Sequence, residues 1–176
     1  MANDAADAVV TLRDGRRVTI RPIQRDDVER NVAFLDALSP PSKHFLFLGG
    51  IARLSDEELK RLCDPDYARD MAYVAVATDP NAPGGQRQVG VCRYAGADDA
   101  TGAEISVAVA DDWQDRGLGK LLLRRLIEHA RTHGVRRLYS MDSAANEPMR
   151  RLARDVGFRE QPDPDDIRQV IYSLQP

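Results

Sequence analysis

The feature that most constrains the fold of this chain is a glycine-bearing loop, residues 114–120. It lies between a strand-like run, 103–110, and a strongly helical run, 118–133, and a second strand-like run follows at 135–141. A strand, a helix and a strand in this order form a crossover whose two strands are parallel. The loop is then an expected anion site, because the first helical N–H groups lack intrahelical partners and the helix dipole favours negative charge there.

The spacing of the loop excludes two familiar phosphate-binding patterns. A P-loop has an earlier glycine and a Ser or Thr after its lysine, but these positions hold Gln114 and Leu121. A dinucleotide fingerprint has a third glycine where Leu122 stands. The pattern that remains is Gln-x-x-Gly-x-Gly, in which Gly117 and Gly119 lack a Cβ and let the backbone approach a ligand closely. A helix-start turn without a ligand is the simpler alternative.

The other runs along the chain predict a mixed α/β (α+β) sheet. Strands are expected at 9–12, 18–23, 71–77, 88–95, 103–110, 135–141 and 167–174, and helices at about 26–38, 41–48, 55–62, 118–133 and 147–156. Only the two strands that flank the crossover helix are expected to be parallel. The pattern therefore predicts about seven strands, with a parallel βαβ pair and helices on both faces.

Length and composition indicate a single domain. Residues 1–8 are mostly small and polar and are expected to form a disordered N-terminus, and residues 9–176 one domain. The formal net charge of -3 gives no electrostatic case for a nucleic acid or an anionic membrane as a partner. Cys63 and Cys92 are expected to be buried free thiols. No run is apolar enough for a membrane span or a signal core, so a cytoplasmic protein is expected.

Three features together resemble the GNAT N-acetyltransferase superfamily. They are the loop after the fourth main strand, Asn146 after the fifth, and a helix that ends in Gly157-Phe158. The resemblance implies the GNAT fold, an acetyl-CoA donor and an amine acceptor. It assigns the CoA diphosphate to the loop residues Gln114, Asp115, Arg116, Gly117, Leu118, Gly119 and Lys120.

The same resemblance implies where the pantetheine arm of acetyl-CoA would lie. It would pair with the exposed backbone of Val107, Ala108 and Val109, where a backbone N–H could polarise the thioester carbonyl. Asn146 would approach the arm, although its position also fits a helix N-cap.

Several further motifs look like the acetyltransferase domain of bacterial protein-lysine acetyltransferases. They are Leu12–Arg16, Ile20–Ile23, Leu38–Ser42, Asp66-Tyr67, Met71–Ala75 and Asp111–Gln114. That domain is often fused to a larger region, whereas here it is expected to be free-standing. The resemblance favours a protein lysine as acceptor. A small-molecule amine is an alternative acceptor, a non-catalytic acyl-CoA sensor is an alternative function, and a monomer and a homodimer are both open.

Glu104 is the candidate general base. A lysine ammonium has a pKa near ~10.4, so transfer at neutral pH is helped by a base or a water relayed to one. A carboxylate in an apolar strand is unusual, and burial would raise its pKa. The place of Glu104 before Gln114 resembles that of the catalytic glutamate in several GNAT protein acetyltransferases. An exposed carboxylate, or one paired with Arg93, is the alternative.

The sequence predicts a site without the usual tyrosine acid and without a metal ion. Many GNAT enzymes carry a tyrosine in the last helix that protonates the leaving thiolate, and here this position is Ala153. Tyr139 and Tyr172 are possible substitutes without an assigned role. No metal is expected, since His129 and His133 have metal-like spacing but no third ligand in the pattern.

Overall fold

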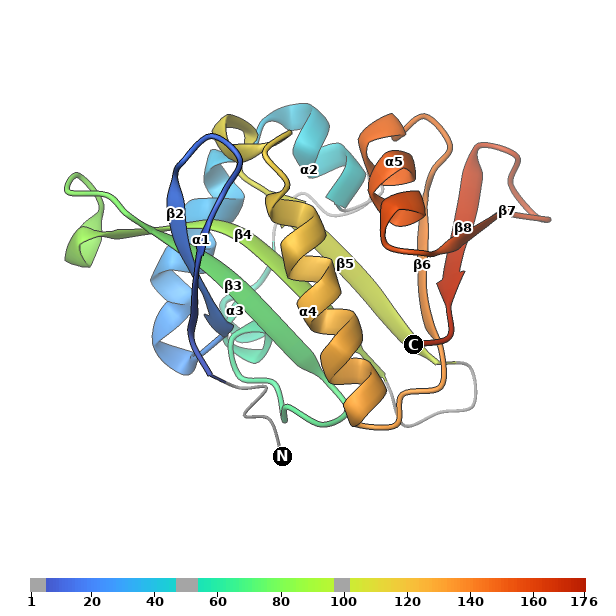
Figure 1. Cartoon of the computed structure of the whole chain (residues 1–176), viewed down its shortest axis with the longest axis horizontal. Coiled ribbons are helices and arrows are strands. Elements are labelled where there is room, and N and C mark those ends of the chain that lie inside the picture. The colour runs from blue at the N-terminus through green and yellow to red at the C-terminus, as the bar shows by residue number, and fades with distance from the viewer. Residues whose placement is uncertain (1–5, 47–53, 97–101) are drawn as a thin grey trace.

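One continuous sheet organises the molecule. The structure is a computed structural model that describes residues 6–46, 54–96 and 102–176, and within these ranges eight strands follow the order β1-β2-β3-β4-β5-β6-β8-β7 (Figure 1). The strands are β1 Ala8–Thr11, β2 Arg17–Pro22, β3 Met71–Thr78, β4 Gln86–Ala95, β5 Ala103–Val109, β6 Leu138–Ser143, β7 Arg159–Pro162 and β8 Gln169–Leu174. Neighbours are antiparallel except β5 and β6, which confirms the expected parallel crossover pair.

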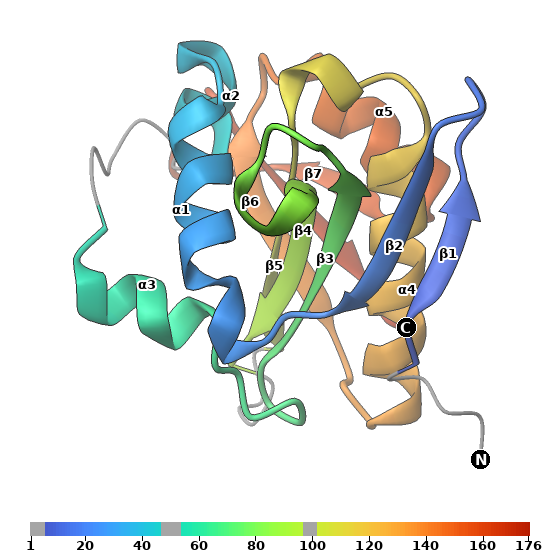
Figure 2. The same cartoon turned by 90° about the vertical axis from the view of Figure 1, so that its left-hand side faces the viewer.

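Helices cover both faces of the sheet, as expected. They are α1 Val28–Ala37, α2 Pro40–Leu46, α3 Asp56–Leu62, α4 Leu118–Thr132 and α5 Glu147–Asp155. In Figure 2, α1 and α3 lie on one side of the central strands and α4 and α5 on the other. Helix α2 lies at the end of the sheet where the β5–α4 loop also lies (Figure 1). The sheet thus separates an α1–α3 face from an α4–α5 face.

The structure differs from the expected elements at three places. Strand β7 was not expected, because all four of its residues are exposed and it has no apolar alternation. Strand β6 begins at Leu138 rather than 135, because the Val135 N–H donates to the Ala130 carbonyl and still belongs to the turn that ends α4. Helix α2 begins one residue earlier than expected, and the rest of its expected range falls in 47–53, outside the described residues. Of the expected disordered segment, residues 1–5 also lie outside the described residues.

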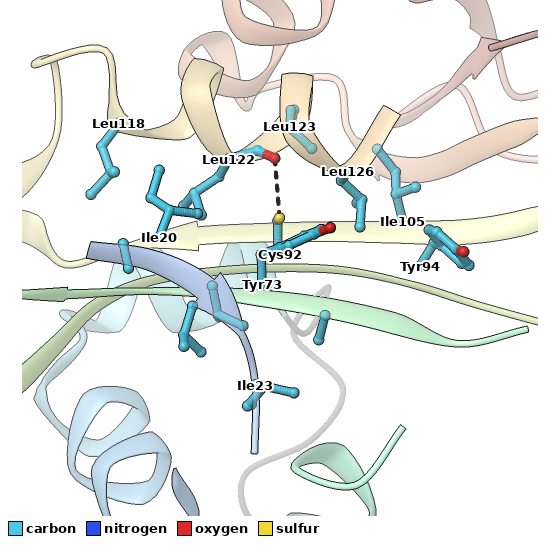
Figure 3. Packing of buried hydrophobic residues seen from close by; sticks show 14 of the residues in the cluster. Ile20, Ile23, Tyr73, Cys92, Tyr94, Ile105, Leu118, Leu122, Leu123 and Leu126 are labelled. Carbon is cyan, nitrogen blue, oxygen red and sulfur yellow. Dashed lines mark hydrogen bonds between the residues drawn. The ribbon is translucent and has the colours of Figure 1, made fainter. Parts of the chain in front are cut away.

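The apolar face of α4 packs on the sheet and fixes the start of the helix. Figure 3 shows Leu118, Leu122, Leu123 and Leu126 against Ile20, Tyr73 and Cys92, all of which are buried. A Cβ at Gly90 would lie 2.9 Å from Leu122 Cδ1, so this glycine permits the close approach. The Cys92 thiol donates to the Leu122 carbonyl at 3.3 Å. This packing holds the N-terminus of α4 at the C-terminal end of β5.

Both cysteines are free and buried, as expected. Burial raises the pKa of Cys63 to about 11 and the pKa of Cys92 to about 12. The two thiols therefore stay protonated and serve as packing groups near neutral pH.

A buried carboxylate at the start of α1 anchors this helix on the α1–α3 face of the sheet. Asp27 is 1% exposed and receives two hydrogen bonds of 2.7 Å from the Arg21 guanidinium and one of 2.6 Å from Arg30. The Gln24 backbone N–H donates to the same carboxylate at 2.8 Å. Two cations and one N–H thus satisfy this acid, and α1 is anchored beside β2.

Candidate active site

The loop between β5 and α4 presents uncapped backbone N–H groups. After a 3₁₀ turn at Asp111–Trp113, Asp115 has a φ of 58° and Gly117, the N-cap of α4, has a φ of 87°. No side chain among the described residues caps the start of α4. The first N–H groups of α4 are therefore free to bind an anion, as the sequence predicts.

A cavity of about 850 Å³ opens in front of this loop. Its wall includes the end of β5, the loop, the start of α4, helix α2, the end of β6 and one side of α5. Ten of the residues expected to bind the cofactor line it: Val107, Ala108, Val109, Gln114, Asp115, Gly117, Leu118, Gly119, Lys120 and Asn146. The cavity has the volume of a small-molecule site.

The cavity continues into a gap between β5 and β6. These strands pair only at Ala103–Leu138 and Glu104–Tyr139, and beyond this point they separate. The Ala110 N–H donates to the Val89 carbonyl of β4. Because antiparallel strands alternate, the N–H and C=O groups of Val107 and Val109 point away from β4 and toward the gap.

The Gln114 side chain organises this region from within the protein. Its amide donates to the Val109 carbonyl at 3.0 Å and to the Ser42 hydroxyl at 3.3 Å. The Gln114 amide is therefore hydrogen-bonded to the Val109 carbonyl, one of the two carbonyls of Val107 and Val109 that face the gap. The backbone N–H groups of Val107 and Val109 and the Val107 carbonyl are left to pair with a ligand.

Asp111 connects the loop to α2. Its carboxylate accepts from the Ser39 backbone N–H at 2.9 Å, the Ser39 hydroxyl at 2.6 Å and the Ser42 hydroxyl at 2.8 Å. Burial opposes ionisation, but these hydrogen bonds from Ser39 and Ser42 lower the pKa of Asp111. The ionised carboxylate thus fixes the N-terminus of α2 beside the cavity.

The β1–β2 hairpin braces the outer side of the loop. The Arg16 guanidinium lies 4.1 Å from the centre of the Trp113 ring and donates to the Asp112 carbonyl at 3.0 Å. Arg116, which was expected to bind the cofactor, does not line the cavity and instead forms a 3.0 Å ion pair with Asp14. Its role in this structure is to hold the loop on the hairpin.

Four cationic side chains surround the loop end of the cavity: Arg13, Lys120, Arg151 and Arg154. They come from the β1–β2 hairpin, α4 and α5. Lys120 forms a 3.3 Å ion pair with Asp155. Positive groups from three elements thus converge where the α4 dipole already favours an anion.

Asp142 and Asn146 form a buried pair at the wall opposite Val107. The Asn146 amide donates to both Asp142 carboxyl oxygens, at 3.2 and 3.3 Å, and its own oxygen accepts from the Met149 N–H, so Asn146 is the N-cap of α5. Burial raises the pKa of Asp142, against the lowering effect of the bonds from Asn146 and Ser143. Burial thus makes ionisation of Asp142 less favourable than that of an exposed aspartate.

Glu104 lies outside the cavity wall, and its side chain is exposed. The expectation that this carboxylate is buried is wrong, because none of the described helices covers β5 and β6 at this end of the α1–α3 face. Arg93 donates instead to the Leu62 carbonyl at 3.2 Å, and no ion pair joins it to Glu104 in the described structure. Glu104 is therefore free to meet solvent or a ligand on that face.

Ala153, which stands where the GNAT resemblance would place a tyrosine, is buried. Neither substitute tyrosine lines the cavity. Tyr172 is buried under α5, and Tyr139 lies beside Glu104 on the opposite face, with the Arg137 guanidinium 5.2 Å from its ring.

Sequence reasoning missed several residues of the cavity wall, among them Arg13, Asp111 and Asp142. A weak signal was present for Asp142, since it directly follows the strand-like run 135–141 and comes shortly before Asn146. Arg13 reaches the loop through tertiary packing alone.

The described residues contain neither a metal-binding cluster nor a membrane-spanning helix. Across residues 6–46, 54–96 and 102–176, no three His, Cys, Asp or Glu side chains gather closely enough to hold a metal ion. Within the same ranges, no helix combines the length and the apolar character needed to cross a membrane.

Comparison with known proteins gives matches over most of the chain. The model of the Acetyltransferase (GNAT) family matches residues 33–158. Acetyltransferase PA5475 of Pseudomonas aeruginosa is 46% identical over 166 residues, 94% of this chain and 88% of that protein. The GNAT domain of S. lividans PAT has a TM-score of 0.84 at 28% identity, covering 100% of this chain and 99% of that one. Mycobacterium smegmatis RimJ, solved with CoA-disulfide, shares the fold at 17% identity and a TM-score of 0.66, covering 96% and 86% of the two chains.

Proposed function

The chain belongs to the GNAT acetyltransferase family, and we propose that it moves an acetyl group from acetyl-CoA to a primary amine. The observation that carries the proposal is the single cavity that joins the uncapped start of α4 to the gap between β5 and β6. An acyl-CoA has an anionic diphosphate at one end and a thioester on a pantetheine arm at the other. The two ends of the cavity match these two chemistries.

The donor would bind mainly through backbone groups. The diphosphate would lie on the N–H groups that follow Gly117, beside the four cationic side chains of the cavity. The pantetheine arm would pair with Val107 and Val109 as an added strand edge, since their backbone groups face the gap. A backbone N–H in this stretch would polarise the thioester carbonyl.

The acceptor amine would lose its proton to Glu104 through water. Glu104 lies three residues before Val107, which is about 10 Å along an extended strand, so direct contact with an amine at the thioester is too long for a hydrogen bond. Its exposed carboxylate keeps an ordinary solvent environment and can receive a proton relayed by a water chain. The proposal therefore makes Glu104 a base that acts at a distance.

A protein lysine is the acceptor that we propose first. Support comes from the 28% identity to the GNAT domain of S. lividans PAT over the whole chain, and from Glu104, which lies on an exposed part of the sheet rather than in a closed pocket. A lysine side chain is long enough to reach such a surface while its polypeptide stays outside. A small-molecule amine is the alternative acceptor.

The test is acetyl-CoA turnover followed by thiol release, with a panel of lysine peptides and small amines. We expect turnover with a peptide lysine, and Glu104→Gln should lower kcat about 100-fold while the CoA dissociation constant stays within about threefold. Unchanged kcat in Glu104→Gln would remove Glu104 as the base. CoA binding without turnover of any acceptor would instead favour a sensor that binds acyl-CoA and transfers nothing.

A further inference from the structure

Acetyl transfer leaves a thiolate that needs a proton, and the cavity contains one group suited to give it. We propose, on the basis of the proposed acetyltransferase function, that Asp142 is the general acid that protonates the departing CoA thiolate. Asp142 is 7% exposed, and its side chain lines the cavity.

The strand register places Asp142 at the level where the thioester arm would lie. Ala103 is paired with Leu138, so an equal advance along the two parallel strands brings Val107 level with Asp142. Beyond that pairing the strands have separated, and both residues line the cavity between them. The carboxyl group thus lines the cavity at the level of Val107, on whose backbone edge the pantetheine arm would be held.

The hydrogen bonds around Asp142 leave one oxygen able to carry a proton. Oδ1 accepts from the Ser143 N–H at 2.7 Å and from the Asn146 amide at 3.2 Å. Oδ2 has only the longer Asn146 contact of 3.3 Å. No cation forms an ion pair with Asp142 in the described structure, and burial raises its pKa. Oδ2 accepts fewer hydrogen bonds than Oδ1, so it is the oxygen that would carry the proton when Asp142 is neutral.

The other acids of the cavity wall are less suited to the role. Asp111 accepts three hydrogen bonds from Ser39 and Ser42 and is held ionised. Asp155 faces the Lys120 ammonium at 3.3 Å. Asp115 is exposed in the loop at the diphosphate end. The tyrosine that serves in many relatives is replaced by Ala153, so Asp142 is the remaining buried proton donor among the described cavity residues.

The step balances with the groups named. The amine nitrogen forms a bond to the acetyl carbon, and the carbon–sulfur bond breaks with its electron pair staying on sulfur. The proton on Oδ2 of Asp142 moves to that sulfur, which gives the CoA thiol and leaves Asp142 as a carboxylate. The proton lost by the amine leaves toward Glu104 and solvent, and a solvent proton restores Asp142.

The first test compares Asp142→Asn with the matched exposed control Asp165→Asn, using acetyl-CoA and the best acceptor of the amine panel. We expect kcat to fall about 100-fold in Asp142→Asn, the CoA dissociation constant to change less than about threefold, and Asp165→Asn to match the wild type. The wild-type kcat should decline as the pH rises and Asp142 loses its proton, and this decline should be absent in Asp142→Asn. A wild-type rate and pH profile in Asp142→Asn would overturn the proposal, as would a loss of CoA affinity as large as the loss of kcat.

A second measurement does not depend on turnover. In protein labelled with ¹³C at aspartate carboxyls, the Asp142 resonance is identified by its absence from Asp142→Asn. We expect it to titrate at higher pH than the other aspartates, and to shift when CoA is added. A resonance that titrates with the exposed aspartates and ignores CoA would overturn the assignment of Asp142. Absence of turnover in the wild type would instead count against the acetyltransferase function, so the two failures are distinguishable.

Discussion

The left-handed glycine at the start of α4 gives the sharpest test of the donor site. Gly117 has a φ of 87°, and a Cβ built on it would lie 3.6 Å from Arg13 Nε, an ordinary contact. Gly117→Ala would therefore add backbone strain of about 1–2 kcal/mol without a steric clash in the free protein. The less flexible unfolded chain offsets about 0.4–1 kcal/mol of this strain. The expected net loss of stability is about 1 kcal/mol, which corresponds to about 2–4 °C in Tm.

The same methyl group should have a larger effect on CoA binding. It would project between the loop and Arg13, into the space where the diphosphate would lie. Loss of one hydrogen bond to a charged phosphate costs about 1.5–3 kcal/mol, so CoA affinity should fall at least about 10-fold, as measured by calorimetry.

Gly134→Ala is the matched control for this experiment. Gly134 follows the other end of α4, has a φ of 74° and has nothing within 4 Å of a built Cβ. It should lose similar stability and keep the wild-type CoA affinity. Equal CoA affinity in the two variants would refute the assignment of the loop to the diphosphate.

Three further predictions concern stability and reactivity. Asp27→Asn should cost about 3–5 kcal/mol in urea unfolding at pH 7, because it leaves the partly buried Arg21 guanidinium without its counter-charge. Burial opposes ionisation of Asp27, but the hydrogen bonds from Arg21 lower its folded pKa. Its contribution is therefore full above the unfolded value of about 3.9 and is lost as the pH falls through the lower folded value. A difference between wild type and variant that does not shrink as the pH is lowered below about 3.9 would contradict this. Cys63 and Cys92 should resist a thiol reagent at pH 7.5 until the protein unfolds, and rapid labelling of native protein would contradict their burial. Asp111→Ala should speed amide hydrogen exchange in α2 about 10-fold, whereas unchanged exchange would mean that its bonds do not anchor the helix.

The parts of the site that lie close together in the sequence were predictable. Gly117 and Gly119 stand in one loop between a strand and a helix, so local periodicity and spacing were enough to predict the loop and the uncapped start of α4. Asn146 was likewise recognisable as a helix N-cap, which the structure confirms. The crossover of β5, α4 and β6 followed from the order of the elements and the rule for parallel connections.

The parts that depend on tertiary packing were not predictable. The alternation in β5 places Glu104 on one face but does not say whether a helix covers that face, and no described helix does so at this point of the sheet. Arg13 lies far from the loop in sequence and meets it only because the hairpin folds against Trp113. Strand β7 is polar along its whole length, so it has no apolar signal and forms because β8 offers it a free edge.

The short pairing between β5 and β6 divides the sheet into two parts. Five strands on one side and three on the other are joined by two residue pairs, Ala103–Leu138 and Glu104–Tyr139. Helix α4 bridges the division, since a Cβ on its Gly119 would lie 3.2 Å from Leu152 of α5 and 3.7 Å from Val109 of β5. The two parts of the sheet are thus paired at one end of the gap, and α4 contacts both of them on one face. A ligand that binds between them would connect the two parts of the sheet, so ligand binding should stabilise the folded chain as a whole.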